Sequence, residues 1–173
     1  MNISLYRMTP ADRDETIEWI TRQYSFDRNE VTWWVDHLHF NWPMSVKAID
    51  VNGQTVGLLN MSDYRINEET EAIVREKPAM LKQLNSLKYI AVFSFIVAES
   101  YRHTPLNHQM IMEIWNELEQ HYDFVFVPVM HSLKTHQYWQ RRGAVEFFRD
   151  KMSVYYLIPL RSNTLLRSLL PQQ

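Results

Sequence analysis

The chain contains seven histidines, a residue type that can bind a metal ion or act as a general acid or base. Their spacing does not indicate a metal site. His37 and His39 point apart if their segment is helical, and His131 and His136 are five residues apart with no carboxylate at ligand spacing. The chain has no cysteine, which excludes zinc–thiolate sites, iron–sulfur clusters, disulfides and thiol nucleophiles. We therefore expect no native metal site.

Basic side chains surround the short segment between an apolar run and an amphipathic run. Arg102, His103 and His108 flank this segment. A helix that begins here turns unpaired N–H groups and the positive end of its dipole toward the segment, which suits an anion such as phosphate. Arg141 and Arg142 form a second basic pair. A solvated helix start is the alternative for Arg102, and it is the simpler interpretation for the two histidines. The arginine pair could reach a phosphate, but a solvated face is the simpler interpretation.

Two ionisable side chains directly follow apolar, strand-like runs. Glu99 follows residues 89–98, and His131 follows residues 124–130. A carboxylate or an imidazole at a strand end can accept a proton from a bound substrate, directly or through water. Position alone makes each of them a candidate general base.

The six tryptophans divide into two groups by their surroundings. Trp19, Trp34 and Trp115 fall near apolar stripes of helical spacing, so we expect them in the core. Trp33 and Trp42 are candidates to line a substrate opening.

The elements that must position these side chains are marked by capping and turn signals. Thr9-Pro10 suits a helix start, and Asp27 with Glu30 suits a capping box. The expected order is a strand (3–8), a helix from residue 9, a helix from residue 27 that Trp42-Pro43 ends, three strands (45–51, 54–61 and 88–98), a helix (107–120), a strand (124–130), a short helix (135–142) and two strands (145–148 and 153–158).

Three connections in this order carry their own signals. Asn52-Gly53 predicts a hairpin with a type I′ turn, which needs positive φ at both central residues. Residues 66–87 are charged and expected to be helical, with Pro78 dividing them. This segment is long for a hairpin, so it either covers a substrate site or forms an interface. Gly143 is a plausible helix C-cap, and the tail after residue 161 is expected to be a short helix or frayed.

The order predicts an α/β (α+β) fold with a mixed, mostly antiparallel sheet of about seven strands and helices on both faces. The net charge of −2 argues against a general nucleic-acid binder, and three glycines argue against a disordered or collagen-like chain. The longest apolar stretch has ten residues, against the roughly 20 that a membrane helix needs. The first residues lack a signal-peptide pattern, so we expect a cytoplasmic protein without a membrane partner.

In element order and length, residues 3–160 resemble the GNAT family, the Gcn5-related N-acetyltransferases. In that family a strand leads into a loop patterned Arg/Gln-x-x-Gly-x-Gly/Ala, whose amides bind the pyrophosphate of acetyl-CoA at a helix N-terminus. Val97, Tyr101 and Arg102 match the pattern. Pro105 and Asn107 occupy its glycine positions. Pro105 lacks an N–H, and Asn107 adds a side chain where the backbone must approach closely, although it can cap the helix.

The second stretch that resembles the family is the short helix before Gly143. The family has a tyrosine four residues before this glycine, and that tyrosine protonates the departing thiolate of coenzyme A. Trp139 occupies that position, and Tyr138 precedes it. One residue is about 100° of helix rotation, so Tyr138 can act as the acid only if the helix is shifted or turned. Ser132 and Ala144 replace the family's asparagine and phenylalanine.

The resemblance implies an acetyl-CoA-dependent N-acetyltransferase that acts by direct transfer to an amine. Tyr138 is then the acid, and Glu99 or His131 is the base. Strand amides hold the pantetheine arm and polarise the thioester carbonyl, while the loop binds phosphate. The implied cofactor-binding residues are Phe95, Ile96, Val97, Ala98, Arg102, His103, Thr104, Leu106 and Asn107.

Other functions stay open at this point. The altered loop and the displaced tyrosine favour a binding or interaction protein that keeps the fold without catalysis. A different acyl carrier, a bulkier acyl group, or self-association through a strand edge near Tyr155 are further alternatives. The acceptor is expected to be a small-molecule or peptide amine, with aminoglycosides and protein lysines also open. We expect one domain over residues 1–160, a tail over 161–173, and a homodimer as one assembly to test.

Overall fold

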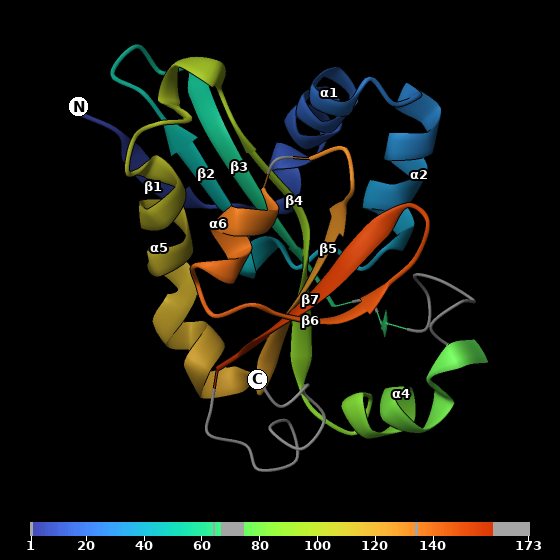
Figure 1. Ribbon diagram of the computed structural model, residues 1–173. Coiled ribbons are helices and arrows are strands. Elements are labelled where there is room, and N and C mark those ends of the chain that lie inside the picture. Colours follow the sequence, from blue (N-terminus) through green and yellow to red (C-terminus); the bar gives the residue numbers. More distant parts are fainter. Residues whose placement is uncertain (1, 64, 67–74, 134, 161–173) are drawn as a thin grey trace. The chain divides into compact units, whose positions relative to one another are not determined.

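The computed structural model describes residues 2–63, 65–66, 75–133 and 135–160 (Figure 1). Its strands are β1 (Ser4–Arg7), β2 (Val46–Ile49), β3 (Thr55–Ser62), β4 (Tyr89–Val97), β5 (Phe124–Met130), β6 (Val145–Arg149) and β7 (Ser153–Pro159). Its helices include α1 (Arg13–Tyr24), α2 (Arg28–His37), α4 (Pro78–Leu84), α5 (Leu106–His121) and α6 (His136–Gln140). The predicted order of elements is confirmed. The predictions for residues 67–74 and for the tail lie outside the described residues.

The seven strands form one mixed sheet in the order β1-β2-β3-β4-β5-β7-β6, which confirms the predicted fold class. β4 and β5 are parallel, whereas β1–β2, β2–β3, β5–β7 and β6–β7 are antiparallel. Contacts within the chain define two compact units. Unit 1 comprises Met1–Asp63 and Val92–Asn116, and unit 2 comprises Tyr64–Ala91 and Glu117–Gln173. β4 and α5 contribute residues to both.

Within unit 1, helices pack on two strands next to each other in the sheet. α1 and α2 lie against one another (Figure 1) and cover β4 through a buried cluster made of Ile17, Ile20, Val31, Val35 and Ile96. α5 approaches β3 closely at Gly57, where a Cβ atom would lie 2.9 Å from the sulfur of Met110. Glycine therefore allows this helix to sit on the strand.

The hairpin at Asn52-Gly53 is confirmed, but its turn type differs from the prediction. Gly53 has a φ of +76°, whereas Asn52 does not adopt a positive φ. The Asp50 N–H donates to the Gln54 carbonyl, so the loop has three residues and ends in a left-handed glycine. The Asp50 carboxylate accepts from the N–H groups of Gln54 and Asn52, and these bonds lower the pKa of Asp50. The Asp50 side chain therefore favours the three-residue loop over the predicted two-residue turn.

The second helix ends earlier than predicted. α2 begins after Asp27, whose carboxylate accepts from the N–H groups of the first turn as expected, but it stops at His37. His39 lies outside the helix with a φ of 52°, so the expectation that His37 and His39 share a helix is wrong. Trp42 and the two residues after it form a separate 3-10 turn. The helix stop is therefore set by the left-handed backbone at His39 rather than by Pro43.

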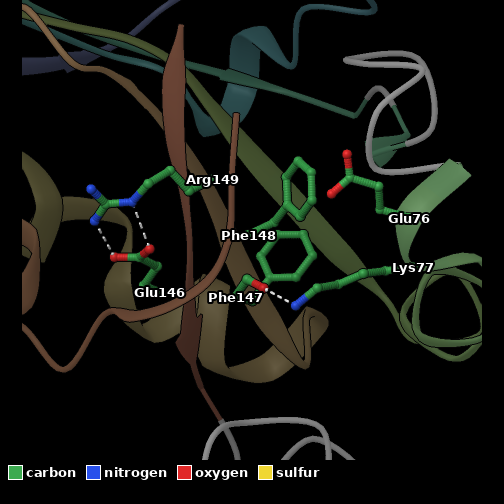
Figure 2. A pocket seen from close by; sticks show the side chains of 6 residues that line it. All are labelled: Glu76, Lys77, Glu146, Phe147, Phe148 and Arg149. Atoms are coloured by element: carbon green, nitrogen blue, oxygen red, sulfur yellow. Dashed lines mark hydrogen bonds and ion pairs between the residues drawn. The ribbon is translucent and has the colours of Figure 1, made fainter. Parts of the chain in front are cut away.

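The predicted edge strand is also corrected. Tyr155 lies on β7, an interior strand, where it pairs with Pro128 of β5 and Phe148 of β6. The strand at this edge of the sheet is β6, which carries a β-bulge between Glu146 and Phe148. Lys77 Nζ donates to the carbonyl of the bulged Phe147 at 2.9 Å (Figure 2). A bulge and a lysine both discourage a second strand from adding to an edge.

We expect Lys77→Met to increase self-association of the chain, because it frees a carbonyl on the edge of β6 and removes the guarding charge. The lost hydrogen bond lowers the free energy of unfolding by about 1 kcal/mol. Sedimentation velocity over a concentration series measures the first effect. Lys82→Met is the matched control, since Lys82 is an exposed lysine of α4. Equal sedimentation of both variants and the wild type contradicts the protective role.

Candidate functional site

The end of β4 and the loop after it bring the predicted cofactor residues together in unit 1. Ile96 and Val97 are buried, and Phe95 and Ala98 are half-buried. The Ala98 N–H donates to the Val56 carbonyl of β3 at 2.9 Å, which fixes the strand end. A 3-10 turn (Glu99–Tyr101) then leads through the loop into α5. Glu99 is exposed in this turn, next to the strand end as predicted.

The pairing of β4 with β5 is short. The parallel ladder joins three residue pairs, from Tyr89–Phe124 to Ala91–Phe126, all within unit 2. β4 continues to Val97 as part of unit 1. β4 also neighbours β3 in the sheet, the backbone of Phe95 bonds to Tyr24, and the Ala98 N–H just after the strand bonds to the Val56 carbonyl. The predicted cofactor strand is this continuing part of β4.

Most N–H groups of the loop already have acceptors inside it. Those of Tyr101, Arg102 and Thr104 donate to carbonyls three residues earlier, at 2.9, 3.2 and 3.1 Å. The N–H of Leu106 donates to the Thr104 hydroxyl at 3.3 Å, and Pro105 has no N–H. The loop therefore offers an anion fewer backbone donors than a glycine-rich loop does. The predicted capping role of Asn107 is wrong, because Asn107 lies inside the first turn of α5 and Thr104 takes the N-terminal amide.

Arg102 lies beside the strand end. Its Nε donates to the Val97 carbonyl at 3.3 Å, while the residue is exposed to solvent. His103 and His108 are also exposed. A guanidinium held in this way presents positive charge next to the first turn of α5, where the dipole adds to it.

One contact of the candidate strand was not predicted from the sequence. Tyr24, at the end of α1, forms a hydrogen bond with the backbone of Phe95. Burial raises the pKa of Tyr24 to about 12, and the hydrogen bond opposes this increase. The sequence places Tyr24 on the apolar stripe of α1, but it carries no signal for a partner 71 residues away in the chain.

Tyr24 also belongs to a continuous group of half-buried aromatic rings in unit 1, here called the aromatic cluster. The ring centroids are 4.7–6.4 Å apart along the series Tyr24, Phe26, Trp34, Phe93, Phe40 and Trp42. Trp34 and Trp42 both pack against the buried core of unit 1, as expected for Trp34. That Trp42 lines a substrate opening stays a prediction. Trp33 is 54% exposed and stacks on His37 outside this cluster.

The predicted acid, Tyr138, lies on α6 in unit 2. Burial raises its pKa to about 12, and the hydrogen-bonded Arg142 guanidinium, 4.5 Å above the ring, opposes this increase. Tyr138 is thus protonated at neutral pH, the state that an acid needs. Trp139, which occupies the family's tyrosine position, is 4% exposed and packs edge-on against Tyr138.

The other predicted base, His131, is exposed at the end of β5 in unit 2. Its Nε2 donates to the Asp150 carbonyl at 2.9 Å, which leaves Nδ1 as the basic atom. His136 binds the Met130 carbonyl and the Tyr156 hydroxyl through its two ring nitrogens, at 3.2 and 3.1 Å. Because a carbonyl group only accepts hydrogen bonds, Nε2 carries the proton in His131 and in His136. His136 therefore fastens α6 to β7, a role that its sequence spacing did not indicate.

The site residues divide between the two units. The strand end, Glu99 and the loop lie in unit 1, and His131 and Tyr138 lie in unit 2. In the described part of the chain, no group of three or more histidine and acidic side chains is arranged to hold a metal ion. No helix there has the length and apolar character that crossing a bilayer requires.

No protein-family model matches the sequence, and a search of curated protein sequences finds no match. Solved structures do match the fold. FeeM, an N-acyl amino acid synthase from uncultured soil microbes, is 12% identical with a TM-score of 0.67, covering 98% of this chain and 99% of that one. An acetyltransferase of the GNAT family from Staphylococcus aureus Mu50 is 15% identical, with a TM-score of 0.63 and coverage of 92% and 100%. The PaiA N-acetyltransferase from Thermoplasma acidophilum, solved with coenzyme A, is 9% identical, with a TM-score of 0.60 and coverage of 92% and 99%.

Proposed function

We propose that this chain, whose fold is that of the GNAT N-acetyltransferases, transfers an acetyl group from acetyl-CoA to an amine. The observation that carries the proposal is the succession from the end of β4, beyond its three residue pairs with β5, through a loop with Arg102 at the basic position, into α5. This order presents strand amides, a guanidinium and a helix N-terminus in one unit. The residues fit the pyrophosphate of acetyl-CoA in part, because the charge is present and several loop amides are already bonded.

The reaction assigns a task to each part of the site. The neutral amine attacks the thioester carbonyl carbon, the new C–N bond forms, and the C–S bond breaks. Backbone N–H groups of the strand end polarise the carbonyl oxygen, and that of Ala98 is excluded because it donates to Val56. Tyr138 gives its proton to the departing thiolate, and the proton of the amine passes to Glu99 or His131, directly or through water. Under this proposal residues 1–160 are the catalytic domain, residues 161–173 a tail, and the protein is cytoplasmic, with a homodimer as one assembly to test.

We expect Arg102→Ala to weaken acetyl-CoA binding by about 1–3 kcal/mol, or about 5- to 150-fold in Kd, the range for a charged hydrogen bond. Calorimetric titration of acetyl-CoA and of coenzyme A measures this change. Arg75→Ala is the control, since the Arg75 side chain is 75% exposed in unit 2 and was not a candidate for the phosphate. An unchanged affinity in Arg102→Ala removes this residue from the site.

The second candidate function is a binding protein that keeps the fold without catalysis. The internally bonded loop and Pro105 favour it. The same titration separates the two functions. Micromolar binding of acetyl-CoA supports the transferase and calls for a screen of acceptor amines, whereas no binding up to millimolar concentration favours the binding protein.

A further inference from the structure

The turn between β6 and β7 in unit 2 holds both the backbone and the ring of His131. The His131 N–H donates to the Met152 carbonyl at 2.9 Å, and Nε2 of the ring donates to the Asp150 carbonyl, also at 2.9 Å. Nδ1 has no hydrogen-bond partner among the described residues, and His131 is exposed. A neutral imidazole with its proton on Nε2 keeps a lone pair on Nδ1. The turn therefore leaves His131 with one defined basic nitrogen.

The side chain of Asp150 gives this turn its shape. Oδ1 accepts from the N–H groups of Met152 and Ser153 at 2.7 and 2.8 Å, and Oδ2 accepts from the Tyr155 hydroxyl at 2.9 Å. Burial alone would raise the pKa of Asp150, but these hydrogen bonds and the charge of His131 lower it. Tyr155 is 4% exposed on the interior strand β7, so it anchors the carboxylate to the core. The carboxylate therefore sets the direction of the backbone carbonyl that holds the His131 ring.

Negative charge also lies within electrostatic reach of this ring. The carboxylates of Asp150 and Glu146 both interact electrostatically with His131. Arg149 holds Glu146 in place through two hydrogen bonds of 2.9 and 2.8 Å (Figure 2). The neighbouring ring is that of His136, whose centroid is 6.4 Å away and whose two nitrogens are bonded to a carbonyl and a hydroxyl. A positive charge on His131 therefore forms next to carboxylates that stabilise it.

We propose that Asp150 is a positioning residue for His131, and that His131 rather than Glu99 takes the proton of the acceptor amine. The inference rests on the proposed function. As the new C–N bond forms, an N–H bond of the amine breaks and its proton passes to Nδ1 of His131, directly or through water. Nε2 keeps its own proton and its bond to the Asp150 carbonyl. A base that is itself oriented by a third group is a recurring arrangement in catalytic sites.

The structure gives the other candidate base less support. Glu99 is exposed at the start of a three-residue 3-10 helix. Within the described part of the chain, no hydrogen bond or ion pair holds its carboxylate. An unheld side chain must give up its freedom before it can accept a proton at a fixed place, and this ordering costs free energy.

The first test observes the ring directly and needs no turnover. In the full chain labelled with nitrogen-15 histidine, proton–nitrogen correlation spectra above about pH 8, where imidazoles are ordinarily neutral, distinguish a bare ring nitrogen from a protonated one. His131→Asn identifies the His131 signals by their loss. We expect the proton on Nε2 alone in the wild type and in Asp150→Asn, because an amide oxygen still accepts from the two turn N–H groups. Asp150→Ala should exchange between both tautomers. A protonated Nδ1 in the wild type, or an unchanged ring in Asp150→Ala, overturns the inference.

The second test compares two aspartates that hold turns in the same way. Asp50 also accepts from two N–H groups, in the hairpin between β2 and β3 of unit 1, so Asp50→Ala is the matched control for loss of a turn carboxylate. We expect Asp150→Ala to lower kcat for acetyl transfer about tenfold, a part of the roughly 10²- to 10⁴-fold that a positioned base contributes. Asp50→Ala should leave kcat unchanged. In a His131→Ala background, Asp150→Ala should cause no further loss, since a positioning residue acts through its base.

The outcomes separate this inference from the proposed function. Equal losses of kcat in Asp50→Ala and Asp150→Ala overturn the positioning role, and full activity in His131→Ala with loss of activity in Glu99→Gln assigns the base to Glu99. A transferase whose His131 ring exchanges between tautomers keeps the proposed function and loses this inference. A wild type that holds the ring on Nε2 but transfers no acetyl group overturns the proposed function and the role of His131 as its base, and it leaves only the arrangement of Asp150 and His131.

Discussion

Replacement of Tyr138 by phenylalanine is expected to reduce kcat for acetyl transfer by about 100-fold or more, while the affinity for coenzyme A changes little. A positioned general acid contributes about 10²- to 10⁴-fold to a rate, and its loss affects the transition state rather than ground-state binding. Phenylalanine keeps the edge-on packing against Trp139 and removes only the hydroxyl. Steady-state kinetics combined with calorimetric titration of coenzyme A measures both quantities.

The pH dependence of the wild type gives a second test of this assignment. A general acid acts in its protonated form, so its contribution is lost as the pH rises through its pKa. Burial raises the pKa of Tyr138 to about 12, although Arg142 opposes this. Deprotonation of Tyr138 should therefore cause no loss of kcat below about pH 11, one unit under that pKa. Tyr6→Phe, on the exposed side of β1, is the control, and full activity in Tyr138→Phe rejects the assignment.

Replacement of Ile96 by alanine is expected to lower the free energy of unfolding by about 2–5 kcal/mol, the usual cost of truncating a buried isoleucine. Ile96 is 2% exposed and joins α1 and α2 to β4 in one cluster. It also lies inside the predicted cofactor strand, so the variant loosens the backbone that is proposed to polarise the thioester. Denaturation with urea measures the loss.

Two control variants provide losses in the free energy of unfolding with which that of Ile96→Ala can be compared. Ile96→Val removes one methyl group and should cost about 0.5–1.5 kcal/mol. Val51→Ala, at a position 71% exposed, should change stability by less than about 0.5 kcal/mol. A loss below that of Ile96→Val contradicts the central place of Ile96 in this cluster.

The elements could be predicted because their signals are local. Asp27 caps α2, Gly143 adopts a φ of +80° after α6, and the alternation of apolar residues marks the strands. Where prediction failed, a side chain a few residues away competed with the expected conformation. Asp50 bonds two N–H groups of its turn and favours a three-residue loop over the type I′ form. The Thr104 hydroxyl accepts from the N–H of Leu106, so α5 begins one residue before Asn107.

The candidate site was predictable only where one segment carries it. The strand and loop from Phe95 to Asn107 follow from a single pattern. Three features each join segments far apart in the chain: the Tyr24–Phe95 contact, the hydrogen bond from Asn60 of β3 to Ser94 of β4, and the aromatic cluster. A sequence does not encode such pairs locally. Single residues of this cluster, such as Trp42, could be noticed, but the chain of rings could not.

The internally bonded loop before α5 has a consequence for ionic strength. Backbone donors work at contact distance and are little affected by dissolved ions, but several of them are already used here. Attraction for a phosphate then depends more on exposed charge, chiefly that of Arg102. The Debye length falls from about 8 Å at physiological salt to about 3 Å at 1 M. The proposed complex with coenzyme A should therefore dissociate in concentrated salt, where a glycine-rich loop of free amides would hold the ligand.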